Sequence, residues 1–120
     1  MFRSLSIAAA LAVATPALAA APTQHLCGWI ENPTPGNWTL TDKNNEWVIG
    51  VQGGHQADGK NFNFPRRKAY YIDVLNGYGY GCGCIDATVD AGKHEVIAIA
   101  KASVLKLSVC RNDKALKEPK

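Results

Sequence analysis

The feature that most restricts the fold of this sequence is its set of four cysteines, Cys27, Cys82, Cys84 and Cys110. All four follow an N-terminal stretch that is typical of a secretory signal peptide, and an even number of cysteines in a small exported domain argues for disulfides. Cys82 and Cys84 lie two apart in a predicted strand, so both side chains point to one face with Cα atoms about 6.6 Å apart. That separation is at the limit for a bond between them. We therefore expect two disulfides, in which one of this pair takes Cys27 and the other takes Cys110.

A metal or redox role for Cys82 and Cys84 is the alternative to disulfides. Zinc sites and thioredoxin-type sites prefer two residues between their cysteines, whereas one residue separates these two. No second cysteine pair and no nearby histidine completes a ligand set in the sequence. The disulfide interpretation is therefore favoured, and we expect no metal and no cofactor.

Residues 1–20 (MFRSLSIAAALAVATPALAA) have the pattern of a signal peptide. Arg3 gives the positive start, residues 5–13 form an apolar run that has no charge, and Ala17-Leu18-Ala19 fits the small-x-small rule for cleavage. The apolar run is shorter than the roughly 20 residues that a membrane-spanning helix needs. We expect a periplasmic or secreted protein with no membrane attachment once the peptide is removed.

The rest of the chain is predicted to be a single β-domain, residues 21–110, followed by a polar tail, residues 111–120, that we expect to fray. Alternating apolar and polar residues predict a hairpin over residues 38–51, and Asn76-Gly77 is a strong turn signal for a second one. At this length, five to six short strands and two disulfides predict an all-β fold, a small antiparallel barrel or sandwich.

Residues 77–84 alternate four glycines with two tyrosines and two cysteines. Glycine weakens a strand, so four in alternation need a reason. We expect an aromatic ring or a neighbouring sheet to lie close against the bare backbone, in preference to a ligand groove.

Candidates for catalysis are few. His55 lies in a glycine-flanked loop with Asp58 three residues later, an arrangement that a small envelope hydrolase or isomerase could use as an acid–base pair. An ordinary turn has the same residues, and no nucleophile motif accompanies them. His25 falls in an entry segment that we expect to fray. The sequence leaves enzymatic activity open but favours a non-catalytic role.

Binding to a cell-envelope polymer or a protein partner is the function that the sequence favours. The formal net charge of +3 is too small and too spread out to indicate nucleic-acid binding. The single basic cluster is residues 66–68, and exposed aromatic side chains would offer a surface for sugars or proteins. Trp38 and Trp47 could also pair across the first hairpin. The candidate binding residues are Trp38, His55, Gln56, Asp58, Arg66, Arg67 and Tyr78.

Three segments together resemble a known family. They are CGWIENPTPGN at residues 27–37, WVIGVQGG at residues 47–54 and NGYGYGCGC at residues 76–84. This pattern resembles a family of small exported proteobacterial proteins that is catalogued only as a domain of unknown function. The resemblance covers nearly the whole chain after the signal peptide, and it implies a secreted bacterial protein without assigning an activity to any residue.

Overall fold

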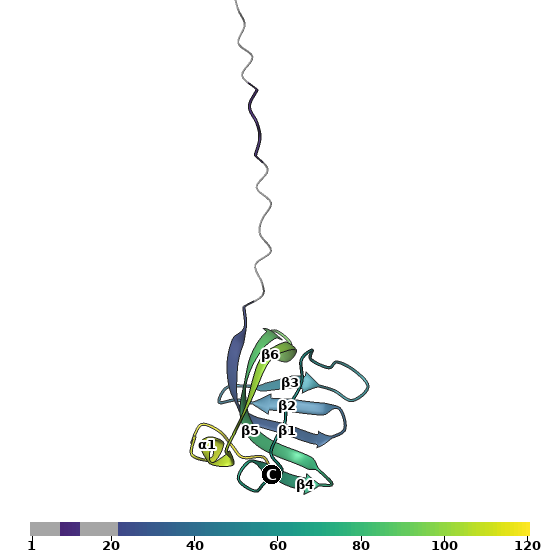
Figure 1. Cartoon of the computed structure of the whole chain (residues 1–120), viewed down its shortest axis with the longest axis vertical. Helices are drawn as coiled ribbons and strands as arrows, with labels where there is room; N and C mark the ends of the chain where they lie inside the picture. The colour runs from purple at the N-terminus through teal and green to yellow at the C-terminus, as the bar shows by residue number, and fades with distance from the viewer. Residues whose placement is uncertain (1–7, 13–21) are drawn as a thin grey trace, which may run out of the picture.

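The computed structural model describes residues 8–12 and 22–120, so residues 1–7 and 13–20 of the predicted signal peptide lie outside the described residues. Among the described residues, no helix has the length and apolar character needed to cross a bilayer. The described part of the chain is mostly β-structure with one short helix (Figure 1). In chain order its elements are β1 (Gln24–Thr34), β2 (Asn37–Thr41), β3 (Glu46–Gly50), β4 (Tyr71–Leu75), β5 (Tyr78–Asp90), β6 (Glu95–Leu105) and α1 (Leu107–Arg111).

The six strands form one mixed sheet in the order β1-β2-β3-β6-β5-β4, and β1 also pairs with β5. The pairings of five strands therefore form a closed circuit, with β4 on the outside next to β5. The expected all-β fold with two disulfides is confirmed. One pairing differs from a purely antiparallel sheet, because β3 and β6 are parallel and meet at Val48 and Glu95. A long segment including β4 and β5 separates these two strands, and such a crossover lets them run in the same direction.

Both predicted hairpins are present. Asn76 and Gly77 connect β4 to β5 with φ angles of 48° and 90°, the two left-handed positions that a type I′ turn requires. In the hairpin of β2 and β3, however, Trp38 does not face Trp47. A register shift places Trp38 opposite Gly50, while Trp47 lies opposite Leu40.

Close packing explains three of the four alternating glycines, as expected, whereas Gly77 lies in the turn before β5 and has nothing close to its Cβ position. A Cβ atom at Gly79 or Gly83 would collide with a carbonyl oxygen of a neighbouring strand, and one at Gly81 would overlap the ring of Phe64. All three glycines are buried. They allow β5, which pairs with β1, β4 and β6, to lie close to the segments that cover it.

The two disulfides are Cys27–Cys84 and Cys82–Cys110. Of the two arrangements that the sequence allows, the register of β1 on β5 selects this one, because it places Cys27 directly opposite Cys84. The second bond joins β5 to α1. Cys82 and Cys84 thus belong to different bonds.

The core has two parts. The larger lies within the circuit of strands and includes Ile30, Leu40, Ile49 and Val96. The smaller lies against α1 and comprises Trp29, Tyr80, Cys82, Leu107 and Cys110. Leu107 and Cys110 lie three apart on α1, so one helix face carries both into this cluster.

The tail does not fray as expected. Leu116 packs against the smaller core, and Glu118 accepts hydrogen bonds from Tyr80 and Arg111. The apolar contact of Leu116 and the charge-assisted hydrogen bonds of Glu118 hold the tail against the domain, although its polar composition predicts a frayed segment.

Candidate functional site

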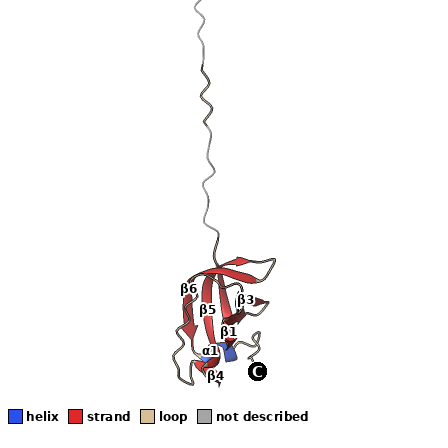
Figure 2. Ribbon diagram, turned by 90° about the vertical axis from the view of Figure 1, so that its right-hand side faces the viewer, coloured by secondary structure: helices blue, strands red, loops and turns tan. Residues whose placement is uncertain are grey.

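A hollow of about 520 Å³ lies where α1 approaches β4, and four of its seven lining residues carry positive charge. Figures 1 and 2, which differ by a quarter turn, both show α1 and β4 at the same end of the domain. We call this site the basic hollow. Its lining consists of Arg66, Arg67, Lys68, Tyr71, Ile72, Asp73 and Arg111.

A turn before β4 builds one side of the basic hollow. The carbonyl oxygen of Arg67 accepts the N–H groups of Tyr70 (2.9 Å) and Tyr71 (3.0 Å). The carbonyl oxygen of Ala69, in the same turn, accepts the N–H of Leu107 at 2.9 Å and so attaches the start of α1. Two segments about forty positions apart in the sequence are thereby brought to one hollow.

Aromatic rings hold the two arginines of this turn. The guanidinium carbon of Arg66 lies 4.3 Å from the centre of the Tyr71 ring, and that of Arg67 lies 5.7 Å from the Tyr70 ring. Arg66 also donates a hydrogen bond to the carbonyl oxygen of Gly77 at 3.0 Å. A guanidinium has five N–H donors, so this arrangement orients the group and leaves most donors free for a ligand.

Arg111, on the opposite side, is held by a carboxylate. Its Nε and Nη2 donate to the two oxygens of Glu118 at 2.6 and 3.1 Å, and the Tyr80 hydroxyl donates to the same carboxylate at 2.6 Å. The hydrogen bond from Arg111 lowers the pKa of Glu118, and the bond from Tyr80 acts in the same direction. Burial raises the pKa of Tyr80 to about 12, and the hydrogen bond to Glu118 also raises it.

The other three cations of the hollow are not neutralised in this way. In the part of the chain that the structure describes, Arg66, Arg67 and Lys68 have no carboxylate within ion-pair distance. The carboxylate of Asp73 lines the same hollow, and both of its oxygens accept the N–H of Gly77 at 3.0 Å. The hollow therefore keeps an excess of positive charge that is open to solvent.

The Tyr80 contact predicts a pH dependence of stability. The folded protein holds the neutral phenol, so the contribution of this group is complete below its ordinary pKa of about 10 and is lost as the pH rises through about 12. We expect the midpoint of urea unfolding to fall between pH 10 and pH 12. Tyr80→Phe keeps the ring but removes the titrating hydroxyl, so its midpoint should fall less over that range. An equal fall in both proteins would contradict the assignment.

The loop residues His55, Gln56 and Asp58 make contacts within the protein. His55 Nε2 donates to the carbonyl oxygen of Val96 at 2.7 Å, and its Nδ1 lies 3.6 Å from Glu95. The Gln56 amide donates to two backbone carbonyls at 2.8 and 2.9 Å, and the backbone of Asp58 pairs with β6. Residues 56–58 pair through their backbone with the end of β3 on one side and with β6 on the other. They therefore continue the contact that β3 and β6 make directly at Val48 and Glu95. The carboxylate placed beside His55 is that of Glu95 and not that of Asp58.

The two aromatic candidates lie in separate places. Trp38 is half-buried and stacks on Phe62 with ring centres 5.2 Å apart, and the ammonium of Lys60 lies 5.4 Å from its ring. Tyr78 is half-buried and lines a different hollow of about 330 Å³ beside the exposed side chains of Val74 and Leu75. Of the seven candidate residues, Arg66 and Arg67 are the two that share the basic hollow.

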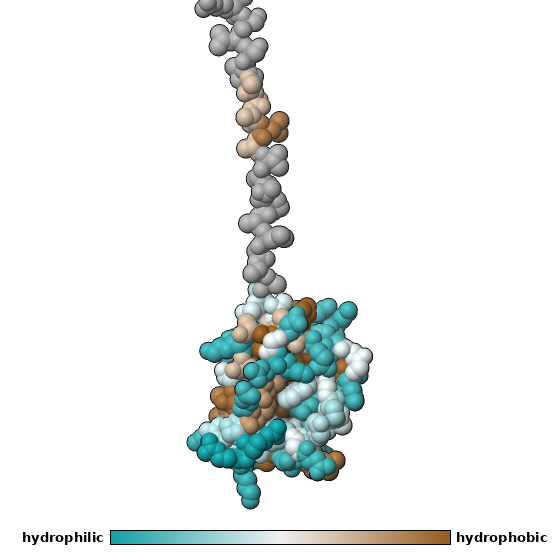
Figure 3. All heavy atoms as spheres, turned by 45° about the vertical axis from the view of Figure 1, so that its right-hand side comes forward, coloured by the Kyte–Doolittle hydropathy of each residue, from teal (hydrophilic) through white to brown (hydrophobic). Residues whose placement is uncertain are grey.

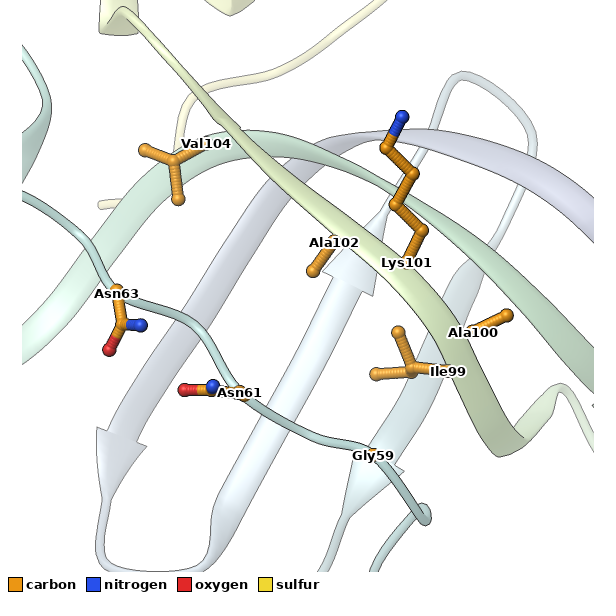
Figure 4. A pocket seen from close by; sticks show the side chains of 8 residues that line it. All are labelled: Gly59, Asn61, Asn63, Ile99, Ala100, Lys101, Ala102 and Val104. Carbon is orange, nitrogen blue, oxygen red and sulfur yellow. The ribbon is translucent and has the colours of Figure 1, made fainter.

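A further hollow, of about 470 Å³, lies between residues 59–63 and β6 (Figure 4). Its loop side carries Asn61 and Asn63, and its β6 side carries Ile99, Ala102 and Val104. Figure 4 shows the Lys101 side chain extending away from the loop. This hollow offers amides and apolar groups, and Lys101 is the one charged residue in its lining, against five in the basic hollow.

Sequence reasoning missed three residues. Lys68 was assigned to the basic cluster but not to the site, and Arg111 was assigned to a fraying tail. His25 was expected to fray as well, but it lies in β1, bonds Asp86 at 2.6 Å and lies 3.3 Å from the sulfur of Cys27. The two-residue spacing of His25 and Cys27 was a usable signal, because such residues share one face of a strand.

One protein-family model matches almost all of the described domain. The model of the family DUF4087, described as a protein of unknown function, matches residues 21–117. The chain belongs to the DUF4087 family. This confirms the resemblance inferred from the three sequence segments, to a family whose function is unknown. No curated protein and no solved structure matches the chain.

Proposed function

We propose that this protein is an exported, non-catalytic domain that binds an anionic polymer of the cell envelope through the basic hollow. Two disulfides in a small domain fit an oxidising compartment outside the cytoplasm. The signal-peptide pattern of residues 1–20 supports export to the periplasm or the medium. The observation that carries the binding proposal is a group of three cations around one hollow, Arg66, Arg67 and Lys68, which have no carboxylate partner among the residues that the structure describes.

The chemistry of the hollow favours repeated carboxylate or phosphate groups. A guanidinium presents two parallel N–H groups that match the oxygens of either anion, and here two such groups and an ammonium lie in succession at residues 66–68. A polymer can engage several cations at once, which strengthens individually weak contacts. On the face drawn in Figure 3, hydrophilic residues predominate and apolar residues form small separate patches. Such a surface favours a polar ligand.

The test is the affinity of the domain for two defined polyanions, polygalacturonate and poly(glycerol phosphate). Replacing both Arg66 and Arg67 by alanine should weaken binding at least about tenfold, because each arginine can donate charge-assisted hydrogen bonds. Raising the salt concentration should weaken binding by the unmodified domain, because these cations are exposed to solvent. Isothermal titration calorimetry measures both effects.

A matched control removes the same amount of charge elsewhere. Lys93 and Lys101 are exposed, lie outside the basic hollow, and have no ion-pair partner among the described residues. Their double alanine variant should bind within about twofold of the unmodified domain, since its hollow is intact. Equal losses in both double variants would show that net charge alone drives binding. If the unmodified domain binds neither polyanion, the polymer proposal fails.

A further inference from the structure

We propose that Cys27–Cys84 is a thiol–disulfide exchange site, which a dithiol opens reversibly. In this site His25 donates a proton to the sulfur of Cys27, and Asp86 positions His25. This inference is independent of the basic hollow, because none of the residues it uses lines that hollow. It assigns a chemical role to a bond that would otherwise serve stability alone.

The first support is the arrangement of a histidine and a carboxylate beside the sulfur. Nδ1 of His25 donates to a carboxylate oxygen of Asp86 at 2.6 Å, because a carboxylate can only accept. That bond turns Nε2 of His25 toward Cys27, whose sulfur lies 3.3 Å away. An imidazolium in this position stabilises a departing thiolate, which is how reactive cysteines obtain a low pKa.

The second support is access. The side chains of His25 and Asp86 are 67% and 36% exposed, and Cys27 is exposed. Cys27 also lines a hollow of about 250 Å³, so the leaving thiolate is open to solvent, and Cys84, whose sulfur is attacked, is only half-buried. The lining of this hollow consists of His25, Leu26, Cys27, Asp42, Lys43, Asp113 and Leu116. By contrast, Cys82 and Cys110 are only 1% and 2% exposed.

The reaction balances as a two-electron exchange. One thiolate of the dithiol attacks Sγ of Cys84, the Cys27–Cys84 bond breaks, and Cys27 leaves with the bonding electron pair and takes the proton of His25. The second sulfur of the dithiol then attacks its own mixed disulfide and releases Cys84, which takes a proton from water. The dithiol is oxidised to a disulfide, and the protein is reduced to two thiols.

The third support is that the sheet holds both sulfurs in place after the bond opens. β1 and β5 pair without a register shift from Gln24 to Asn32, and Cys27 and Cys84 are directly opposite within that ladder. The backbone pairing therefore keeps the two thiols adjacent, so the bond can form again without a search. These conditions suit a reversible exchange.

The experiment treats the folded, oxidised domain with dithiothreitol at pH 7 and traps free thiols with iodoacetamide for peptide mass spectrometry. We expect alkylation of Cys27 and Cys84 while Cys82–Cys110 stays closed, with the circular dichroism spectrum unchanged. His25→Ala should slow the opening roughly tenfold, because the leaving thiolate loses its proton donor. His94→Ala, at an exposed histidine in the turn before β6, should open at the unmodified rate.

The relative reactivity of the two thiols distinguishes the proposed proton-donating role of His25 from a merely structural role. After opening, Cys27 should react with iodoacetamide faster than Cys84, and His25→Ala and Asp86→Asn should both reduce that difference. The proposal is overturned if both disulfides open at one common rate, which would report global unfolding. It is also overturned if His25→Ala opens as fast as the unmodified domain.

Discussion

Replacement of both Cys82 and Cys110 by alanine is expected to lower the free energy of unfolding by about 3 to 4 kcal/mol. The bond closes a loop with a sequence separation of 28, and the chain-entropy relation gives about this value for a loop of that size. The two residues are also the centre of the smaller core, against Trp29 and Leu107. Since a small domain has a total stability of about 5 to 15 kcal/mol, the variant should fold with a much lower urea midpoint.

This variant also tests how α1 is positioned. Cys110 precedes Arg111, so the disulfide holds one side of the basic hollow against β5. The matched control replaces Cys27 and Cys84, whose loop is longer and should contribute about 4 kcal/mol. Both double variants should lose stability, but only the Cys82/Cys110 variant should also lose affinity for the polyanions. Equal affinities in the two variants would show that the disulfide does not position the hollow.

Gly28→Ala is expected to lower the free energy of unfolding by about 3 kcal/mol, the upper part of the range for overpacking. Gly28 is buried in β1 just before that strand begins to pair with β2. A Cβ atom there would overlap the carbonyl oxygen of Thr41 and approach the Cα of Asp42 to 3.1 Å. Both are backbone atoms, which cannot move aside as the end of a flexible side chain can. Thermal or urea unfolding measures the loss.

Gly54→Ala provides the control for this substitution. A Cβ atom at Gly54 would meet its nearest neighbours at 3.8 Å, which is ordinary contact, and the residue does not have a positive φ. The change should be neutral or stabilising by a few tenths of a kcal/mol, because alanine restricts the unfolded chain. If Gly28→Ala is equally neutral, β1 does not approach β2 as closely as described.

The parts of the fold that depend on local sequence could be predicted. The turn at Asn76-Gly77 requires only two adjacent residues that tolerate positive φ, so the hairpin follows from the sequence. β1 was missed although one of its partners, β2, follows it directly, because CGWIEN is apolar on both faces and does not alternate, and its other partner, β5, is far away in the sequence. The parallel contact of β3 with β6 was missed because no turn connects these strands.

The candidate site was predictable to a similar extent. Arg66 and Arg67 are neighbours in the sequence, and their clustering was visible without a structure. Arg111 joins them only because a disulfide and a backbone hydrogen bond bring α1 to the turn before β4. His55 was singled out for its loop, but the strand that supplies its carboxylate neighbour, Glu95, lies forty positions further on. Residue type indicated chemistry, while long-range pairing decided which groups meet.

The disulfide connectivity has a consequence for how the domain reaches its native state. The bonds join the first cysteine to the third and the second to the fourth. A chain that is oxidised in the order in which it emerges from the ribosome meets Cys82 before Cys84, and would join Cys27 to the wrong partner. Correct oxidation must then wait until β1 and β5 have paired, or wrong bonds must be reshuffled. A compartment that supplies a disulfide isomerase is therefore the natural place to produce this domain in quantity.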